Sequence, residues 1–139
     1  MEDNDADVLL FERAVARAPR PFTVRAATDG EQAQRVLAEE RPLPSLILLD
    51  LKLPRKSGIE ILQWLNTRPD LKDLPIVVLT SSSEAEDIRA AYRLGAKAYI
   101  VKPVGFDLLR GLVAAVSDYL LNRGERTFAE HAVPRPTLM

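Results

Sequence analysis

Cysteine is absent from this chain of 139 residues, and histidine occurs once. The lack of cysteine excludes disulfide bonds, thiolate metal sites and a cysteine nucleophile, and it is typical of proteins in a reducing compartment. The chain also lacks any apolar run near the length of about 18 residues that a membrane-spanning helix needs, and it shows no signal-peptide pattern. We therefore expect a cytoplasmic protein without membrane contact.

An excess of charge of either sign is missing as well. Lys and Arg number 19 and Asp and Glu number 20, which leaves a net charge of -1. A basic surplus would indicate a nucleic-acid partner and a strong acidic excess would indicate disorder, so neither class is favoured. With 47% hydrophobic residues, the chain has the size and composition of one globular domain.

What the chain does contain is an apolar run that ends in a carboxylate. Residues 46–49 are four consecutive apolar residues, followed directly by Asp50. Such a run is typical of a strand that is buried on both faces. An unpaired carboxylate is costly to bury, so Asp50 either faces water at the edge of the sheet or has a cation beside it. Both alternatives make Asp50 a candidate site residue.

Two later apolar runs have the same form. Residues 76–79 end in Thr80, and residues 98–101 end in Lys102. Patterns typical of amphipathic helices cover residues 5–18, 28–41, 57–68, 83–95 and 106–121. Capping boxes open three of these helices, at Thr28 with Glu31, Ser57 with Glu60, and Ser83 with Glu86. Alternating apolar residues over 22–27 predict a short edge strand.

Strands that alternate with helices in this way predict an α/β fold with a doubly wound parallel sheet. The functional site of such a sheet lies beyond the carboxyl ends of its strands. Asp50, Thr80 and Lys102 stand at three of those ends, so we expect a carboxylate, a hydroxyl and an amine to meet at one edge. Taken singly, each has an ordinary structural explanation as a turn cap, a strand end or an ion pair.

Glu2 and Asp3 add two acids close to the same edge. Alone, they are explained as helix N-terminal acids. Together with Asp50 they form a cluster of oxygen ligands that suits Mg²⁺. A carboxylate, a metal, a hydroxyl and an ammonium are the groups that phosphoryl transfer to an aspartate requires.

The chain resembles a bacterial response-regulator receiver domain over residues 1–122. The matching features are Glu2-Asp3, Asp50 followed by Leu53-Pro54 and Gly58, Thr80 followed by Ser81 and Ser82, and Lys102-Pro103. The resemblance implies the flavodoxin-like receiver fold and a two-component signalling protein without catalysis beyond its own phosphorylation and dephosphorylation. The segments 2–11 and 69–88 are most similar to small stand-alone regulators that partner phytochrome-like histidine kinases.

The resemblance also implies roles for individual residues. Asp50 would accept a phosphoryl group from a kinase, and Glu2, Asp3, Asp50 and the backbone carbonyl of Lys52 would hold Mg²⁺. Lys102 would neutralise the phosphoryl group, and a cis Lys102-Pro103 bond would aim its side chain into the site. Thr80 would bind a phosphoryl oxygen and draw Tyr99 from an exposed to a buried position, although simple strand packing also explains Tyr99.

Two features depart from the family pattern. Lys52 is a cation two residues after the acceptor, and we hypothesise that it alters the phosphate lifetime unless it points into solvent. The second departure is that only Met1 precedes Glu2, where receivers have an apolar first strand, in the middle of a sheet of order 2-1-3-4-5. The first strand is therefore expected to be missing or truncated. Three remedies are open: an upstream start, closure of the gap by the second strand, or a segment from another protomer.

The tail over residues 123–139 has no helical period, so no DNA-binding output domain is expected within it. It is either a mobile end or an arm whose Phe128, Val133 and Leu138 pack on a second protomer of a homodimer. Two other functions remain open for the chain. One is a hydrolase or phosphatase with an aspartyl intermediate, and the other is a phosphorylation-independent scaffold or dimerisation module with a disabled metal pocket.

Overall fold

The computed structural model describes residues 5–19, 22–53, 56–71 and 73–122. Its elements are α1 (Asp5–Ala16), α2 (Gly30–Glu39), β1 (Ile47–Leu49), α3 (Gly58–Asn66), β2 (Ile76–Thr80), α4 (Ala85–Arg93), β3 (Ala98–Val101) and α5 (Phe106–Asn122). The three strands pair in parallel in the order β1-β2-β3. The predicted α/β fold with a parallel sheet is confirmed, and β1, which leads into Asp50, is an edge strand of the described sheet.

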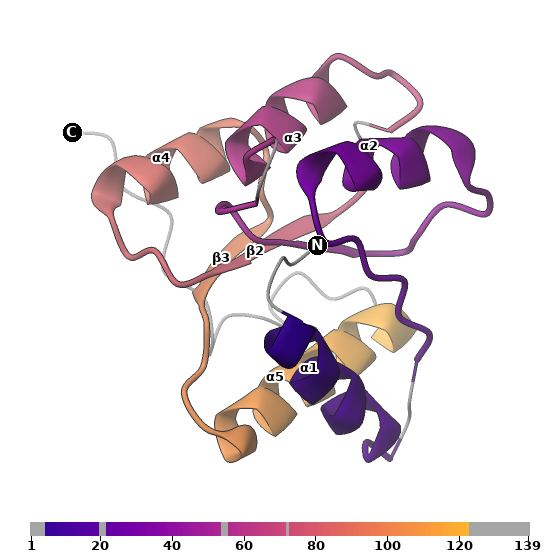
Figure 1. Cartoon of the computed structure of the whole chain (residues 1–139), viewed down its shortest axis with the longest axis vertical. Coiled ribbons are helices and arrows are strands. Elements are labelled where there is room, and N and C mark those ends of the chain that lie inside the picture. Colours follow the sequence, from indigo (N-terminus) through magenta and orange to yellow (C-terminus); the bar gives the residue numbers. More distant parts are fainter. Residues whose placement is uncertain (1–4, 20–21, 54–55, 72, 123–139) are drawn as a thin grey trace.

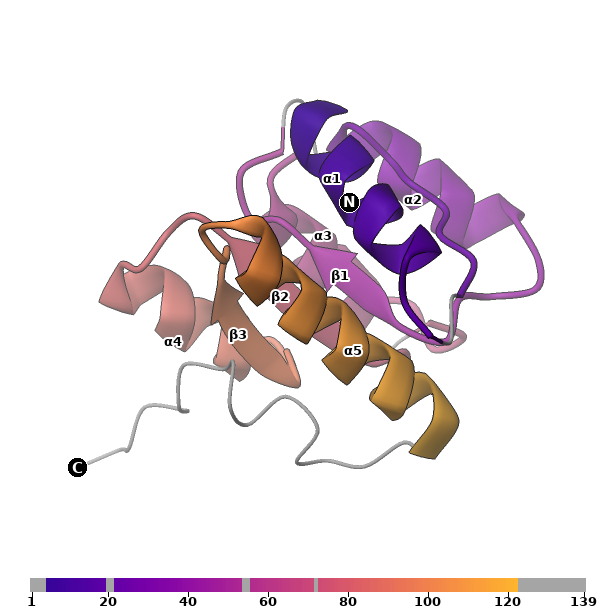
Figure 2. The same ribbon diagram turned by 90° about the horizontal axis from the view of Figure 1, so that it is seen from below.

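Helices cover both faces of this sheet. Figures 1 and 2 show α2, α3 and α4 on one face and α1 and α5 on the other. Successive side chains of a strand point to opposite faces, so Leu49 and Val78 enter the core under α2, α3 and α4, while Val77 and Ile100 pack toward α5. Both faces are therefore apolar, which explains the uninterrupted apolar runs of the sequence.

One of the three predicted capping boxes forms as expected. The Ser57 hydroxyl accepts a hydrogen bond from the Glu60 amide at the start of α3. The box predicted at Thr28 is wrong by one residue, because the Asp29 side chain caps α2 and accepts from the Gln32 amide. Thr28 instead donates its own amide to the Gln32 side chain.

The box predicted at Ser83 and Glu86 is wrong. Helix α4 begins after Glu84, whose side chain makes no capping hydrogen bond. The neighbouring serine, Ser82, turns inward instead and accepts a hydrogen bond from the Glu84 amide. At the other end of α4, Gly95 takes a φ of 100° directly after the helix, as the sequence predicts for a C-terminal cap.

The edge strand predicted over residues 22–27 is also wrong. Phe22 and Val24 do turn to the cluster between α1 and α5 while Arg25 is exposed, so the alternating pattern is real. No strand forms because this segment makes no ladder with another described strand. A cavity of about 830 Å³ separates this segment from β1. Segment 22–27, the second strand of the family order, therefore does not close the gap that the missing first strand leaves beside β1.

None of the helices in the described ranges is long and apolar enough to cross a membrane. Helix α5 ends at Asn122, and the tail over residues 123–139 lies outside the described part of the chain.

Candidate functional site

The three predicted site residues meet at the carboxyl edge of the sheet. Asp50 directly follows β1, Thr80 is the last residue of β2, and Lys102 directly follows β3. Thr80 Oγ1 donates to Asp50 Oδ1 at 2.8 Å, and Lys102 Nζ lies 2.9 Å from Asp50 Oδ2. The Asp50 residue is only 4% exposed, and the cation beside it answers the question that the sequence left open.

The Asp50 carboxylate is held in its ionised form. Burial raises its pKa, but hydrogen bonds from the Lys52 amide, Lys102 and Thr80, together with the charge of Lys102, outweigh burial and hold the pKa below its usual value. A carboxylate has roughly four acceptor positions, and these donors take three of them. Among the contacts that the described residues make, one position therefore remains for a cation or an incoming group.

Gly58 is needed by the loop that follows Asp50. A Cβ added at this position would lie 2.4 Å from the Asp50 carbonyl oxygen, and the Gly58 amide donates to the Leu51 carbonyl at 2.9 Å. No side chain fits into that approach. The start of α3 is thereby fixed against the backbone of Asp50, which explains why glycine stands at this place of the motif.

The Lys102-Pro103 bond was expected to be cis, and this expectation is wrong. Among the described residues, the cis peptide bond is Arg41-Pro42. Lys102 reaches Asp50 without it, since its amide is bound to the Thr80 carbonyl at 2.9 Å and its side chain extends from there along the edge.

Asp7 is a site residue that sequence reasoning missed. Its Oδ2 lies 3.2 Å from Lys102 Nζ, so the ammonium stands between two carboxylates from α1 and the end of β1. The signal for it in the sequence is the acid-rich segment 2–7, which ends in Asp7. The contact places the first turn of α1 at the same edge as Asp50.

A line of hydrogen bonds leads from the site toward α4. The Ser82 amide approaches Thr80 Oγ1 at 3.5 Å, and the Ser82 carbonyl accepts from the Tyr99 hydroxyl at 2.9 Å. The Ser82 hydroxyl donates to the carboxylate of Asp87, which lies in α4.

Tyr99 is fully buried in this arrangement. Burial raises the pKa of its hydroxyl, and the nearby acids Asp87, Asp50 and Glu84 add to this effect against the hydrogen bond to Ser82. The hydroxyl therefore stays neutral and acts as a donor. The structure shows one position of Tyr99, the buried one, which agrees with both explanations that the sequence left open.

The remaining predicted metal ligands are placed only in part. The Lys52 side chain is exposed, and its amide donates to Asp50 at 3.0 Å. Glu2 and Asp3 lie outside the described residues, and within the described ranges no group of three acids or histidines gathers around a possible metal position. The chemistry of the described donors, an ionised carboxylate with an open acceptor position, still suits a hard divalent cation.

Comparison with known proteins gives a family match over most of the chain. Residues 1–114 match the response regulator receiver domain family. The chain is 34% identical over 125 residues to the probable methanogenesis regulatory protein FilR2 of Methanothrix harundinacea, covering 87% of this chain and 81% of that protein. It is also 34% identical over 126 residues to the response regulator Rcp1 of Synechocystis, covering 87% and 86%.

Solved structures agree with the sequence match. The phosphorylated cyanobacterial phytochrome response regulator RcpA superposes with a TM-score of 0.81 at 36% identity, covering 89% of this chain and 92% of that chain. The Mn²⁺-bound form of Rcp1 superposes with a TM-score of 0.78 at 31% identity, covering 99% and 96%.

The ion pair at the site generates a prediction about stability. Replacing Lys102 by Met leaves the Asp50 carboxylate buried without its cation. Because the Lys102 side chain is partly exposed, we expect the free energy of unfolding at pH 7 to fall by about 3 kcal/mol, the lower end of the range for a broken buried pair. The lowered pKa of Asp50 means that the pair stabilises the fold above about pH 4, the unfolded value, and that this stabilisation is lost as the pH falls through the folded pKa. Urea unfolding at pH 7 and at pH 3 measures both effects.

Asp50→Asn provides the matched background for this experiment. In that variant the carboxylate is already absent, so adding Lys102→Met should cost much less than it does in the original chain. An equal cost in both backgrounds, or an equal loss at the two pH values, would contradict the ion pair as the source of the stability.

Proposed function

Because the chain belongs to the response regulator receiver family, we propose that Asp50 accepts a phosphoryl group from a phosphohistidine of a sensor histidine kinase and that the phosphorylated form switches protein contacts. The observation that carries the proposal is the convergence of Asp50, Thr80 and Lys102 from three strand ends, with the carboxylate ionised and bound on both sides. The proposal includes no other catalytic activity and places the transfer in the cytoplasm.

The transfer follows from the groups around Asp50. One carboxylate oxygen of Asp50 attacks phosphorus, an O–P bond forms, the N–P bond of the phosphohistidine breaks, and the imidazole leaves with the electron pair. Lys102 then neutralises the phosphoryl oxygens in place of the free carboxylate. In this structure the Thr80 hydroxyl donates to Asp50. After the transfer, the same hydroxyl is close enough to donate to the new phosphoryl group.

We propose Mg²⁺ as the cofactor of this step. Glu2, Asp3, Asp50 and the Lys52 carbonyl would hold it, and its charge would stabilise the transferring phosphoryl group. Support comes from the open acceptor position on Asp50 and from the relative Rcp1, whose structure is described as Mn²⁺-bound.

The same proposal gives Thr80 and Tyr99 the role of reporting the phosphorylation state. A phosphoryl group that takes the Thr80 hydroxyl moves the loop that carries Ser82, and Ser82 binds both Tyr99 and Asp87. A local charge would in this way change the surface around α4.

Intact-mass measurement after incubation with a small phosphodonor and Mg²⁺ tests the function. We expect the mass of one phosphoryl group to be added to the original chain and nothing to be added to Asp50→Asn. The matched control is Ser81→Ala, which removes an exposed hydroxyl one residue beyond Thr80 and should be phosphorylated normally.

Each alternative function has its own outcome in the same experiment. Sustained consumption of the phosphodonor, far beyond one equivalent, would favour the hydrolase. The absence of any adduct on the original chain would favour the phosphorylation-independent scaffold and overturn the proposal.

Lys52 yields a second prediction for the phosphorylated form. Its side chain is exposed two residues after the acceptor, so its ammonium can approach the dianionic phosphoryl group. We expect Lys52→Asn to shorten the lifetime of the aspartyl phosphate at least about twofold, because a nearby cation stabilises that charge. Decay followed by intact mass measures the lifetime, and equal lifetimes would refute the idea.

The partners that we propose are a histidine kinase of the phytochrome type and a second copy of the chain. Support for the kinase type comes from RcpA, which is described as a phytochrome response regulator. Support for a homodimer comes from exposed apolar side chains beside the site, among which Val104 is 86% and Leu108 59% exposed.

Light scattering tests the proposed dimer and the role of the tail together. We expect the mass of two chains for the full sequence and the mass of one chain after deletion of residues 125–139, because Phe128, Val133 and Leu138 are proposed to pack on the partner. An unchanged mass after deletion would end the arm hypothesis.

A further inference from the structure

Tyr99 forms hydrogen bonds at both ends of helix α4, which packs against α3 and β3 (Figure 1). Its hydroxyl donates to the Ser82 carbonyl, shortly before the helix begins, at 2.9 Å. Its backbone amide donates to the hydroxyl of Tyr92, in the last turn of the helix, at 3.2 Å. Both tyrosines are buried, with 0% of Tyr99 and 8% of Tyr92 exposed. The two contacts therefore connect one residue of the sheet with the beginning and the end of the same helix.

The contact with Tyr92 gives the Tyr99 amide an acceptor outside the sheet. β3 is an outer strand of the described sheet, and β2 is its one strand neighbour among the described residues. A buried backbone amide without an acceptor is costly, and at Tyr99 a side chain of α4 supplies that acceptor. A phenylalanine would fill the same space without this hydrogen bond, so the hydroxyl of Tyr92 has a role that packing alone does not give.

Asn66 adds a second contact at the same end of α4. Its side-chain amide donates to the carbonyl of Leu94, the residue directly after the helix, at 2.7 Å, and to the carbonyl of Leu62 in α3 at 2.9 Å. Carbonyls at the end of a helix lack partners within that helix. Asn66 therefore joins the end of α4 to α3 through backbone groups.

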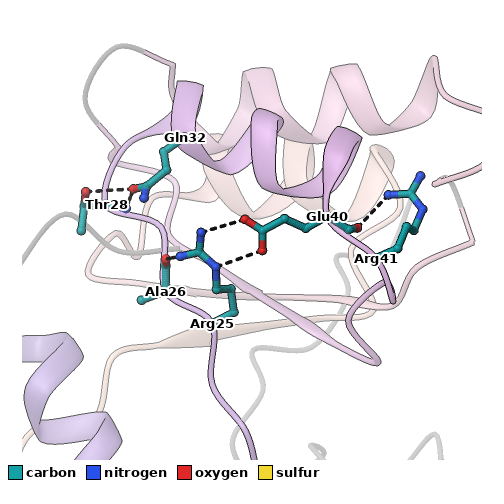
Figure 3. A network of polar contacts seen from close by, with 6 residues as sticks. All are labelled: Arg25, Ala26, Thr28, Gln32, Glu40 and Arg41. Atoms are coloured by element: carbon teal, nitrogen blue, oxygen red, sulfur yellow. Dashed lines mark hydrogen bonds and ion pairs between the residues drawn. The ribbon is translucent and has the colours of Figure 1, made fainter.

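The end of α2 offers a comparison within the same chain. Arg25 donates two hydrogen bonds to the Glu40 carboxylate, at 3.1 and 2.8 Å, and Arg41 donates to the Glu40 carbonyl (Figure 3). The side chains of Arg25 and Glu40 are 54% and 50% exposed, so water readily replaces these partners when they separate. Water has no such access to the Tyr99 amide, because both tyrosines are buried. The contact at the end of α4 is therefore the more costly of the two to break.

The beginning of α4 has contacts that a phosphoryl group on Asp50 can change. Thr80 donates to Asp50, and the Ser82 amide approaches the Thr80 hydroxyl at 3.5 Å. The Ser82 hydroxyl in turn donates to Asp87 in the first turn of α4. At the other end of the helix, the partners are backbone groups that α3 and β3 hold in place, so they do not depend on the charge at Asp50.

We infer that Tyr92 is a positioning residue of the phosphorylation switch. Its contact with the Tyr99 amide fixes the last turn of α4, so that phosphorylation moves the first turn and residues 81–84 about this fixed end. The inference rests on the proposed phosphorylation of Asp50 and adds to it which part of the surface changes. A partner that distinguishes the two states then contacts the first turn of α4, where Glu84 and Glu86 are exposed.

Hydrogen exchange of single amides tests the Tyr92 contact without phosphorylation. Tyr92→Phe removes the hydroxyl and keeps the ring, so we expect the Tyr99 amide to exchange about tenfold faster relative to the amides of β2, because it loses a buried hydrogen bond. The matched control is Tyr119→Phe, which removes the hydroxyl of another buried tyrosine, in α5, and should leave the Tyr99 amide unchanged. Equal exchange of this amide in the original chain and in Tyr92→Phe, or equal acceleration in the control, would overturn the inference.

The same measurement on the phosphorylated chain tests the fixed end. With excess small phosphodonor and Mg²⁺, we expect exchange of residues 84–88 to change at least about threefold in the original chain and exchange of residues 91–95 to stay constant. In Tyr92→Phe the change should extend to residues 91–95. Asn66→Ala should extend it less, because the contact of Asn66 is exposed.

A purely structural role of Tyr92 predicts a different result. Exchange in Tyr92→Phe would then be faster by the same factor with and without the phosphodonor, and the response to phosphorylation would stay confined to residues 84–88. That result, or a response of the whole helix in the original chain, would overturn the inference.

Intact mass measured on the same samples separates this inference from the proposed function. An adduct of one phosphoryl group together with either of those two results leaves the phosphorylation of Asp50 standing and removes the role of Tyr92. The absence of any adduct on the original chain would overturn the proposed function and the role in the switch with it.

Discussion

The ion pair between Asp50 and Lys102 is the interaction on which the site depends. A carboxylate that is almost fully buried would cost several kcal/mol without a cation, and here the cation follows β3, the outer strand on the opposite side of the sheet. Asp50 follows β1 and Lys102 follows β3, so β2 lies between them. The pair therefore forms only if both strand registers are correct, because a shift by one residue would turn each side chain to the opposite face.

Buried polar groups lie between this pair and α4. Thr80 and Ser82 are buried polar residues in an apolar core, and both have hydrogen-bond partners. Such groups have few alternative arrangements, since each must keep a partner or lose a buried hydrogen bond. Tyr99 donates its hydroxyl to the Ser82 carbonyl, so hydrogen bonds connect a large core side chain with the residues around Asp50.

The sequence predicted what depends on long patterns and missed what depends on individual contacts. The three apolar runs ending in Asp50, Thr80 and Lys102 placed the site at one edge, because a parallel sheet brings the ends of its strands together. Asp7 was missed because the position of a helix over a sheet is set by packing with α5, which no local pattern encodes. The cap at Asp29 rather than Thr28 reflects a choice between two adjacent acceptors.

The failed edge strand at residues 22–27 is the most informative difference. Its alternating pattern is satisfied by packing of Phe22 and Val24, yet strand formation also requires a hydrogen-bonded neighbour. A cavity lies between this segment and β1, and its lining includes Asp50. Asp50 follows a three-residue strand at the edge of the described sheet, and ladder hydrogen bonds to β2 hold this strand from one side. No described strand pairs with the other side of β1, so the positions of Asp50 and Lys102 also depend on the contact of Lys102 with Asp7 in α1.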